Sequence, residues 1–182
     1  MKAVFLDRDG TLNEDPGYLS HPKQMKLLPG VGEGLRLLKD AGFELIVVSN
    51  QSGVGRGIFK ETMLPEIHAR MNELLAPTGV KIERFYLCTH RPEENCACRK
   101  PKPFLIHQAE TDLGVDLTNS YMIGDKLSDI EVGENAGVKA SVLVRTGNGQ
   151  ETEHKMQPGQ AAYIADGFLE AAQWITKGSS KR

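Results

Sequence analysis

The sequence predicts an α/β fold, a Rossmann-like parallel sheet with helices on both faces. Short apolar segments alternate with longer segments of amphipathic helical pattern along most of the chain. Such alternation is typical of right-handed strand–helix–strand crossovers, which build parallel sheets. Polar clusters follow four of the apolar segments, after Leu6, Val48, Leu87 and Ile123. Because ligands of these sheets bind beyond the carboxyl ends of the strands, the clusters predict one shared site.

The first half of the chain predicts three strands and two helices. Residues 43–48 form a run that is apolar except for Glu44, the pattern of a strand that is covered on both faces. The helix before this run is expected to stop at Gly42, a common residue after a helix end. In chain order we expect a strand at 2–6, a helix at 31–41, the strand at 43–48, a helix at 61–75 and a strand at 82–87.

The second half continues the alternation, with weaker patterns toward its end. We expect a helix at 104–113, a strand at 121–123, a helix at 128–136, a strand at 140–144, a strand at 162–164 and a helix at 168–175. No internal repeat or low-complexity segment interrupts this order. The sequence therefore predicts a single domain over residues 1–177, followed by a flexible tail at 178–182.

Composition narrows the class of protein. The chain has 182 residues, of which 40% are hydrophobic and 25% charged, and its formal net charge is −2. Without a basic excess, binding to nucleic acid or to an anionic membrane lacks its usual electrostatic driving force. No stretch approaches the roughly 20 apolar residues that span a bilayer, and Asp7 interrupts the N-terminus before a signal peptide could form. We expect a cytoplasmic monomer.

Two acidic residues directly follow the first strand. Asp7 and Asp9 are two apart, so both side chains can point the same way, and their charges repel unless a cation shares the site. Carboxylate oxygens are ligands that Mg²⁺ prefers. Aspartate can also attack phosphorus to form an acyl phosphate, while a second carboxyl group protonates the leaving alcohol. The pair indicates either phosphate chemistry or a polar strand end with two exposed acids.

Two more polar positions suit an anionic ligand, and a third adds another carboxylate. Ser49 offers a hydroxyl next to a turn whose backbone N–H groups can bind an anion. Lys100 lies in a loop stiffened by Pro101 and Pro103, where a fixed cation would stabilise a transferring phosphoryl group. Asp125 follows a later strand. Taken singly, these residues could equally be turn formers or solvated charges.

Together these clusters resemble the motifs of the haloacid dehalogenase-like phosphatases. The matching segments are Asp7-x-Asp9-x-Thr11, Ser49, Lys100 and Gly124-Asp125-x-x-x-Asp129. The resemblance implies that Asp7 is the nucleophile and Asp9 the general acid/base. It implies catalytic Mg²⁺ held by the side chains of Asp7 and Asp125 and by the backbone carbonyl of Asp9. Ser49 and Lys100 would bind the phosphoryl oxygens, and Asp129 would orient other groups of the site.

Longer matches point to the branch of this family that removes the C7 phosphate of D-glycero-D-manno-heptose 1,7-bisphosphate, a step toward the nucleotide-activated heptose of lipopolysaccharide. They lie within residues 1–150, at residues 7–13, 49–57 and 98–103. Ser49 stands where the branch usually has threonine and keeps the hydroxyl, whereas Phe104 replaces a frequent glycine. The resemblance implies substrate contacts at Arg8, Asp15, Pro16, Gly17, Tyr18, Asn50, Gln51, Ser52, Arg99 and Lys126.

A loop at 88–102 carries all three cysteines of the chain. Cys88, His90, Cys96 and Cys98 crowd into this segment, and an odd number of cysteines is a poor disulfide framework. Three thiolates and an imidazole suit a closed tetrahedral Zn²⁺ site, which leaves no position for a catalytic water. We therefore expect a structural zinc that holds the loop bearing Arg99 and Lys100. The alternative is a set of small buried residues beside a surface histidine.

The short intervals after Asp9 and Gly53 leave little room for the large cap domain of many relatives. We expect an open site, flanked by the loop near Asp15 and the zinc loop, for a small phosphorylated sugar. Three functions stay open. The first is hydrolysis of the heptose bisphosphate, a phosphoric monoester hydrolase reaction. The second is hydrolysis of histidinol phosphate or another small phosphomonoester, as in a related phosphatase domain. The third is a zinc-stabilised binding module without catalysis.

Overall fold

A parallel sheet with the strand order β3-β2-β1-β4-β5-β6 carries the fold. In this computed structural model, which describes residues 1–179, every neighbouring pair of strands is parallel. The order reverses direction between β1 and β4, so this sheet has its switch point at the carboxyl ends of these two strands. The strands are β1 (Ala3–Leu6), β2 (Glu44–Asn50), β3 (Arg84–Cys88), β4 (Tyr121–Gly124), β5 (Ala140–Val144) and β6 (Tyr163–Ala165).

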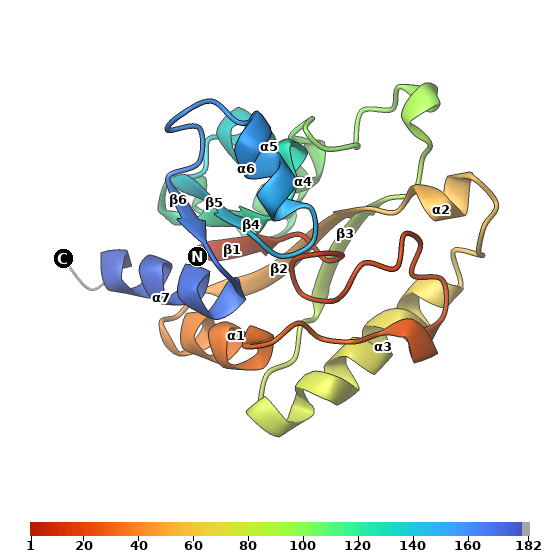
Figure 1. Cartoon of the computed structure of the whole chain (residues 1–182), viewed down its shortest axis with the longest axis horizontal. Coiled ribbons are helices and arrows are strands. Elements are labelled where there is room, and N and C mark those ends of the chain that lie inside the picture. The colour runs from red at the N-terminus through yellow and green to blue at the C-terminus, as the bar shows by residue number, and fades with distance from the viewer. Residues whose placement is uncertain (180–182) are drawn as a thin grey trace.

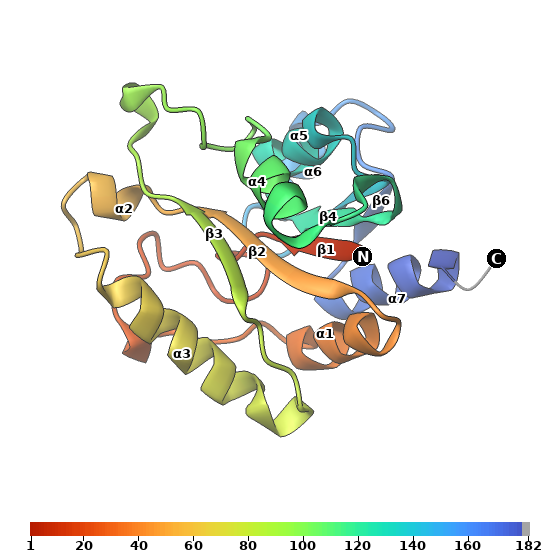
Figure 2. The ribbon, with the colours of Figure 1, turned by 180° about the vertical axis from the view of Figure 1, so that it is seen from behind.

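Helices cover the two faces of the sheet, which confirms the predicted fold class (Figures 1 and 2). On one face lie α1, α3 and α7, and on the other lie α4 and α5. The helices are α1 (Val31–Asp40), α2 (Ser52–Gly55), α3 (Met63–Leu75), α4 (Phe104–Leu113), α5 (Leu127–Ala136), α6 (Gly149–Lys155) and α7 (Phe168–Ser179).

Strand β1 shows why these strands are apolar throughout. Its four residues are buried, but Val4 and Leu6 belong to the core under α1, α3 and α7, whereas Ala3 and Phe5 belong to the core under α4 and α5. Successive side chains of a strand point to opposite faces, so a central strand needs apolar residues at every position. The two cores hold β1 rigidly between its neighbours. The residues that directly follow Leu6, Asp7 among them, are therefore fixed in position as well.

Most predicted elements lie within two residues of the observed ones, and the end of β2 differs where the site begins. Ser49 and Asn50, which follow the predicted strand at 43–48, belong to β2 and pair with Leu87 and Cys88 of β3. Pairing with a neighbouring strand extends β2 beyond its apolar run. The short helices α2 and α6 were not predicted, since neither is long enough to show a helical period.

The C-terminal segment also differs from its prediction. Helix α7 continues to Ser179, so Gly178 and Ser179 are helical where a tail was expected. The remaining residues of that predicted tail, 180–182, lie outside the described residues. Among the helices of residues 1–179, none combines the length and the apolar character that crossing a membrane requires.

Candidate active site

A cavity of about 320 Å³ opens at the carboxyl ends of the central strands. The loop after β1, helix α2 and the loop between β3 and α4 gather at this edge of the sheet, on the right of Figure 1. Twelve of the sequence-predicted site residues line the cavity. They are Asp7, Asp9, Asp15, Gly17, Tyr18, Ser49, Asn50, Gln51, Ser52, Arg99, Lys100 and Lys126. The structure therefore brings together residues that the sequence spreads over more than 100 positions.

Lys100 forms the centre of a buried ion cluster. Its Nζ donates to Asp7 Oδ1 at 2.8 Å, to Asp129 Oδ1 at 2.7 Å and to the carbonyl oxygen of Val48 at 2.8 Å. Burial alone would lower the pKa of Lys100, but the carboxylates of Asp129 and Asp7 outweigh this effect and raise it. Lys100 is thus a permanent cation at the floor of the cavity, suited to an anionic ligand.

Three carboxylates meet beside this lysine. Oxygens of Asp7, Asp125 and Asp129 lie within 4.8 Å of one another. Burial, followed by the nearby charges of Asp7 and Asp129, raises the pKa of Asp125 to about 8. Asp7 Oδ2 is buried and has no hydrogen-bond partner within residues 1–179. Crowded carboxylates with an unpartnered buried oxygen fit a hard divalent cation such as Mg²⁺, which would offset the repulsion and accept that oxygen as a ligand.

Asp125 is positioned by residues that the sequence analysis did not assign. Thr11 Oγ1 donates to Asp125 Oδ1 at 3.1 Å, and the backbone N–H of Asn148 donates to Asp125 Oδ2 at 2.8 Å. Thr152 Oγ1 donates to the carbonyl oxygen of Asp125 at 2.8 Å. Asn148 and Thr152 lie on the segment after β5 and in α6, beside the polar Thr-Gly-Asn-Gly run at 146–149. A fifth polar cluster at a strand end was the signal that could have located them.

The Asp9 carboxylate is held in a different way from the other acids. Arg8 donates to both of its oxygens, Nε to Oδ1 at 3.0 Å and Nη2 to Oδ2 at 3.1 Å. Asn13 Nδ2 and Gln51 Nε2 each donate to Asp9 at 2.9 Å. Burial alone would raise the pKa of Asp9, but the charge of Arg8 and these hydrogen bonds lower it. Asp9 is therefore a fixed carboxylate at the cavity wall, outside the three-carboxylate cluster.

Two of the expected substrate contacts do not lie in the cavity. Arg8 is fully buried and does not line it, because the guanidinium turns toward Asp9, Gln51 and His68 instead. Its contact with the substrate therefore stays a prediction. Pro16 is exposed and is likewise outside the lining. Arg99 does line the cavity, and its buried Nη1 has no hydrogen-bond partner in the described part of the chain, so it is available to a ligand.

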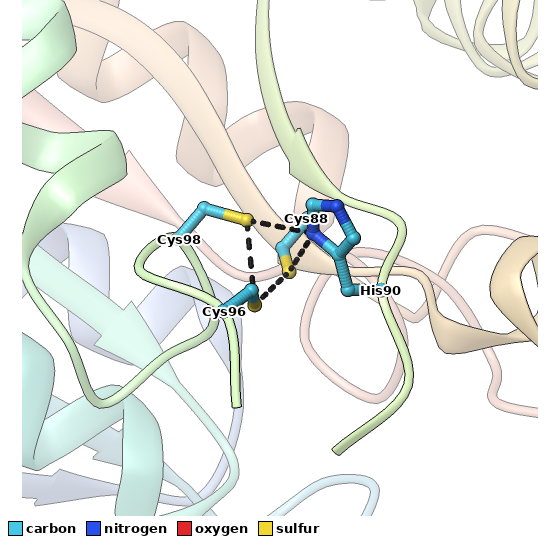
Figure 3. Close-up of side chains that lie close together, drawn as sticks. All are labelled: Cys88, His90, Cys96 and Cys98. Atoms are coloured by element: carbon cyan, nitrogen blue, oxygen red, sulfur yellow. Dashed lines mark hydrogen bonds between the residues drawn. The ribbon is translucent and has the colours of Figure 1, made fainter. Parts of the chain in front are cut away.

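The four predicted zinc ligands converge in the loop between β3 and α4 (Figure 3). Cys96 Sγ lies 3.5 Å from Cys88 Sγ and 3.6 Å from Cys98 Sγ, and His90 Nδ1 lies 3.7 and 3.2 Å from the sulfurs of Cys88 and Cys98. Ligands of a tetrahedral zinc are separated by about 3.6–3.8 Å, given Zn–S and Zn–N distances of about 2.3 and 2.1 Å. The three cysteines are free thiols. This donor set and spacing fit one Zn²⁺.

The Cys/His cluster is connected to the cavity through the chain itself. Cys98 precedes Arg99 and Lys100, and the backbone of Lys100 is held by Asn50. The Lys100 N–H donates to Asn50 Oδ1 at 3.0 Å, and Asn50 Nδ2 donates to the Lys100 carbonyl at 3.3 Å. The loop is thus fixed at both sides of Arg99, by the cluster before it and by β2 after it.

Comparison with known proteins identifies several relatives. Residues 97–171 match the family described as HAD-hydrolase-like. The D-glycero-beta-D-manno-heptose-1,7-bisphosphate 7-phosphatase of Haemophilus ducreyi is 46% identical over 153 residues, which cover 80% of this chain and 84% of that protein. The enzyme of the same name from Haemophilus influenzae is 42% identical over 175 residues, which cover 93% and 94%. A crystal structure of D,D-heptose 1,7-bisphosphate phosphatase from B. bronchiseptica, complexed with magnesium and phosphate, has a TM-score of 0.91 at 32% identity, over 98% of this chain and 99% of that one.

Proposed function

The chain belongs to the D-glycero-beta-D-manno-heptose-1,7-bisphosphate 7-phosphatases of the haloacid dehalogenase-like hydrolases, and from this we propose that it is a Mg²⁺-dependent phosphoric monoester hydrolase. Its substrate is the heptose 1,7-bisphosphate, from which it removes the C7 phosphate on the way to the nucleotide-activated heptose of lipopolysaccharide. The observation that carries the proposal is the Asp7 carboxylate, with Oδ1 held by Lys100 and Oδ2 buried without a partner among residues 1–179.

Asp7 is the nucleophile of the proposed reaction. Its carboxylate attacks the phosphorus in line with the leaving sugar oxygen, and Lys100, which donates to Oδ1, keeps that carboxylate in place. Asp9 donates a proton to the leaving oxygen, and the phosphorus–oxygen bond breaks to give heptose 1-phosphate and an aspartyl phosphate on Asp7. In the second step Asp9 accepts a proton from water. The water oxygen attacks the phosphorus, and inorganic phosphate leaves Asp7.

The remaining polar groups bind the phosphoryl group and the metal ion. Lys100 and the hydroxyl of Ser49, which accepts a hydrogen bond from Gln51 Nε2 at 2.8 Å, face the phosphoryl group. Asp7 and Asp125, with the carbonyl of Asp9, would hold Mg²⁺, and Asp129 orients Lys100. When bound, this ion neutralises charge on the phosphoryl oxygens.

The Cys/His cluster completes the proposal with a structural zinc. Cys88, His90, Cys96 and Cys98 would hold it, and the spacing of their donor atoms supports this assignment. A set of four protein ligands leaves no open position, so zinc contributes to folding and to the position of Arg99 and Lys100 rather than to the reaction.

Arg99 is suited to bind the second phosphate of a bisphosphate substrate. The Arg99 guanidinium, whose Nη1 has no partner among residues 1–179, and the Lys126 ammonium both line the cavity. Neither is assigned to the transferred phosphate, which Lys100 and Ser49 bind. A guanidinium suits bidentate binding of a phosphate group. We assign Arg99 to the C1 phosphate, with Lys126 and the residues Asp15, Gly17, Tyr18 and Ser52 as further substrate contacts.

We propose that the active form is a monomer. A cytoplasmic location remains a prediction from the reaction that is proposed. Size-exclusion chromatography with light scattering would measure the mass of the purified protein, and a mass twice that of the chain would contradict the monomer.

Phosphate release from a panel of esters tests the proposed substrate. The panel contains both anomers of D-glycero-D-manno-heptose 1,7-bisphosphate, fructose 1,6-bisphosphate and histidinol phosphate. We expect the highest kcat/KM on a heptose bisphosphate. The Asp7→Asn variant should release no phosphate from any of the esters. A preference for histidinol phosphate would show that this ester, and not the heptose bisphosphate, is the substrate. Weak activity on all four esters would favour a module without catalysis.

A further inference from the structure

Arg8 is a buried cation whose contacts are confined to the back of the cavity wall. Its side chain is fully buried although it lies between two predicted active-site acids in the sequence. The guanidinium donates to both oxygens of Asp9, at 3.0 and 3.1 Å, and to Gln51 Oε1 at 3.1 Å. A planar fork of this kind fixes both the position and the plane of a carboxylate. Arg8 therefore determines how Asp9 faces the cavity.

The third side of this guanidinium is occupied by His68 of α3. His68 Nε2 lies 3.2 Å from Arg8 Nη1. Arginine can only donate hydrogen bonds, so Nε2 must accept, which requires a neutral ring with its proton on Nδ1. Burial, then the charge of Arg8, lowers the pKa of His68 to about 3, in keeping with a neutral ring. The imidazole is the acceptor that completes the partners of Arg8.

The ring of His68 is itself held in place by β3. It stacks on the ring of Phe85, with 3.9 Å between centroids and 9° between planes. His68 is 7% exposed and does not line the cavity. A continuous chain of contacts thus runs from Phe85 through His68 and Arg8 to Asp9, and it ends at a group that faces the ligand.

We propose that His68, acting through Arg8, is a positioning residue for the proton transfers of Asp9. The inference rests on the proposed phosphatase function, in which Asp9 protonates the leaving oxygen. Without an acceptor at position 68, Nη1 of Arg8 would be buried without a partner, and the guanidinium would rotate toward another acceptor. The Asp9 carboxylate would then no longer be held in its orientation, although no residue that lines the cavity had been substituted.

The leaving group of the substrate separates this role from a merely structural one. A sugar alkoxide must be protonated as it leaves, whereas p-nitrophenolate is stable without protonation. The ratio kcat/KM reports the steps through formation of the aspartyl phosphate. Misplacement of Asp9 should therefore lower kcat/KM on the sugar ester far more than on p-nitrophenyl phosphate.

The experiment compares His68→Leu, which removes the acceptor, with His68→Gln, which restores one. On the heptose 1,7-bisphosphate we expect His68→Leu to lower kcat/KM by about 10- to 100-fold, and on p-nitrophenyl phosphate by less than about threefold. We expect His68→Gln to recover to within about threefold of the wild type on both. Ile67→Val, a neighbouring buried position of α3 that belongs to the apolar core, is the matched control and should change neither ratio.

Arg8→Lys provides an independent arm, because it keeps the charge but removes the fork, and we expect the same dependence on the leaving group. Equal losses on both esters, no loss in His68→Leu, or a His68→Gln variant no better than His68→Leu would each overturn the inference. If His68→Leu fails to fold, the Arg8→Lys and His68→Gln results decide it. Activity retained in Asp7→Asn would instead overturn the proposed function, so the two failures are distinguishable.

Discussion

Gly147 lies against the carboxylate of Asp125, so closely that a β-carbon at position 147 would come within 2.3 Å of Asp125 Oδ2. The backbone of Gly147 has φ of 55°, in the left-handed region that glycine adopts without strain. This close approach lets the next residue, Asn148, direct its N–H to the same oxygen. The segment after β5 is thus shaped to hold one carboxylate of the candidate metal site.

Substitution of Gly147 by alanine should weaken metal binding. The β-carbon would come within 2.3 Å of Asp125 Oδ2 and 2.6 Å of the Gly10 Cα. Both the Asp125 carboxylate and the loop after β1 would have to shift, so we expect the Mg²⁺ concentration for half-maximal phosphatase activity to rise at least about tenfold. Gly159→Ala is the matched control, since Gly159 also has positive φ, 79°, but its β-carbon would have no atom within 4 Å. Equal Mg²⁺ requirements in the two variants would show that the close approach to Asp125 does not matter.

Arg99 should distinguish bisphosphates from monophosphates. Loss of a charge-assisted contact corresponds to about 1.5–3 kcal/mol, so Arg99→Ala should raise KM for the heptose bisphosphate about 10- to 100-fold. KM for p-nitrophenyl phosphate, which has no second phosphate, should stay within about threefold. Arg91→Ala, an exposed arginine of the same loop, is the control and should leave both values unchanged. A parallel rise in KM for both esters in Arg99→Ala would place Arg99 at the transferred phosphate instead.

Removal of one cysteine ligand should release the proposed zinc. Metal analysis of the purified protein is expected to find about one zinc per chain, and in Cys96→Ala less than about one tenth of that. Because the metal would close the loop, the variant should lose at least about 2 kcal/mol of stability, a fall of about 4–8 °C or more in Tm. His154→Ala, an exposed histidine outside the loop, should keep its zinc. A normally folded wild-type protein without bound metal would exclude the site.

His68 should make the protein sensitive to acid. Its pKa is about 3 in the folded chain and about 6.5 when unfolded, so between these values the unfolded chain binds the additional proton. The free energy of unfolding therefore falls as the pH falls through this window, by about 2 kcal/mol from this group between pH 7 and pH 5. Urea unfolding of His68→Gln should show a pH-dependent loss smaller by that amount.

The exposed His154 supplies the control for this measurement, because His154→Gln should lose as much stability on acidification as the wild type. Any loss of metal at pH 5 affects all three proteins alike, so the difference between them isolates His68. Identical losses in His68→Gln and the wild type would mean that the imidazole is not held neutral in the folded protein.

Local sequence was sufficient for the strands, for most helices and for the positions of the acidic residues. Continuous apolar runs such as residues 45–48 mark central strands, since both faces of the sheet are covered. Asp7 and Asp125 follow such runs, and parallel strands bring their carboxyl ends to one edge. The crowding of Cys88, His90, Cys96 and Cys98 was equally visible, because all four belong to one loop.

Tertiary structure alone decided what each neighbouring side chain does. Arg8 stands between Asp7 and Asp9 in the sequence, yet it turns away from the cavity, and its partner His68 follows 60 residues later. Asn148 and Thr152 reach Asp125 because α6 packs against the end of β5. Hydrogen-bond partners far apart along the chain depend on how helices settle on the sheet, a property of the whole core rather than of any local pattern. The sequence by itself thus determined the sheet and its chemistry-bearing edge, and packing decided which residues bind the ligand and which hold those residues in place.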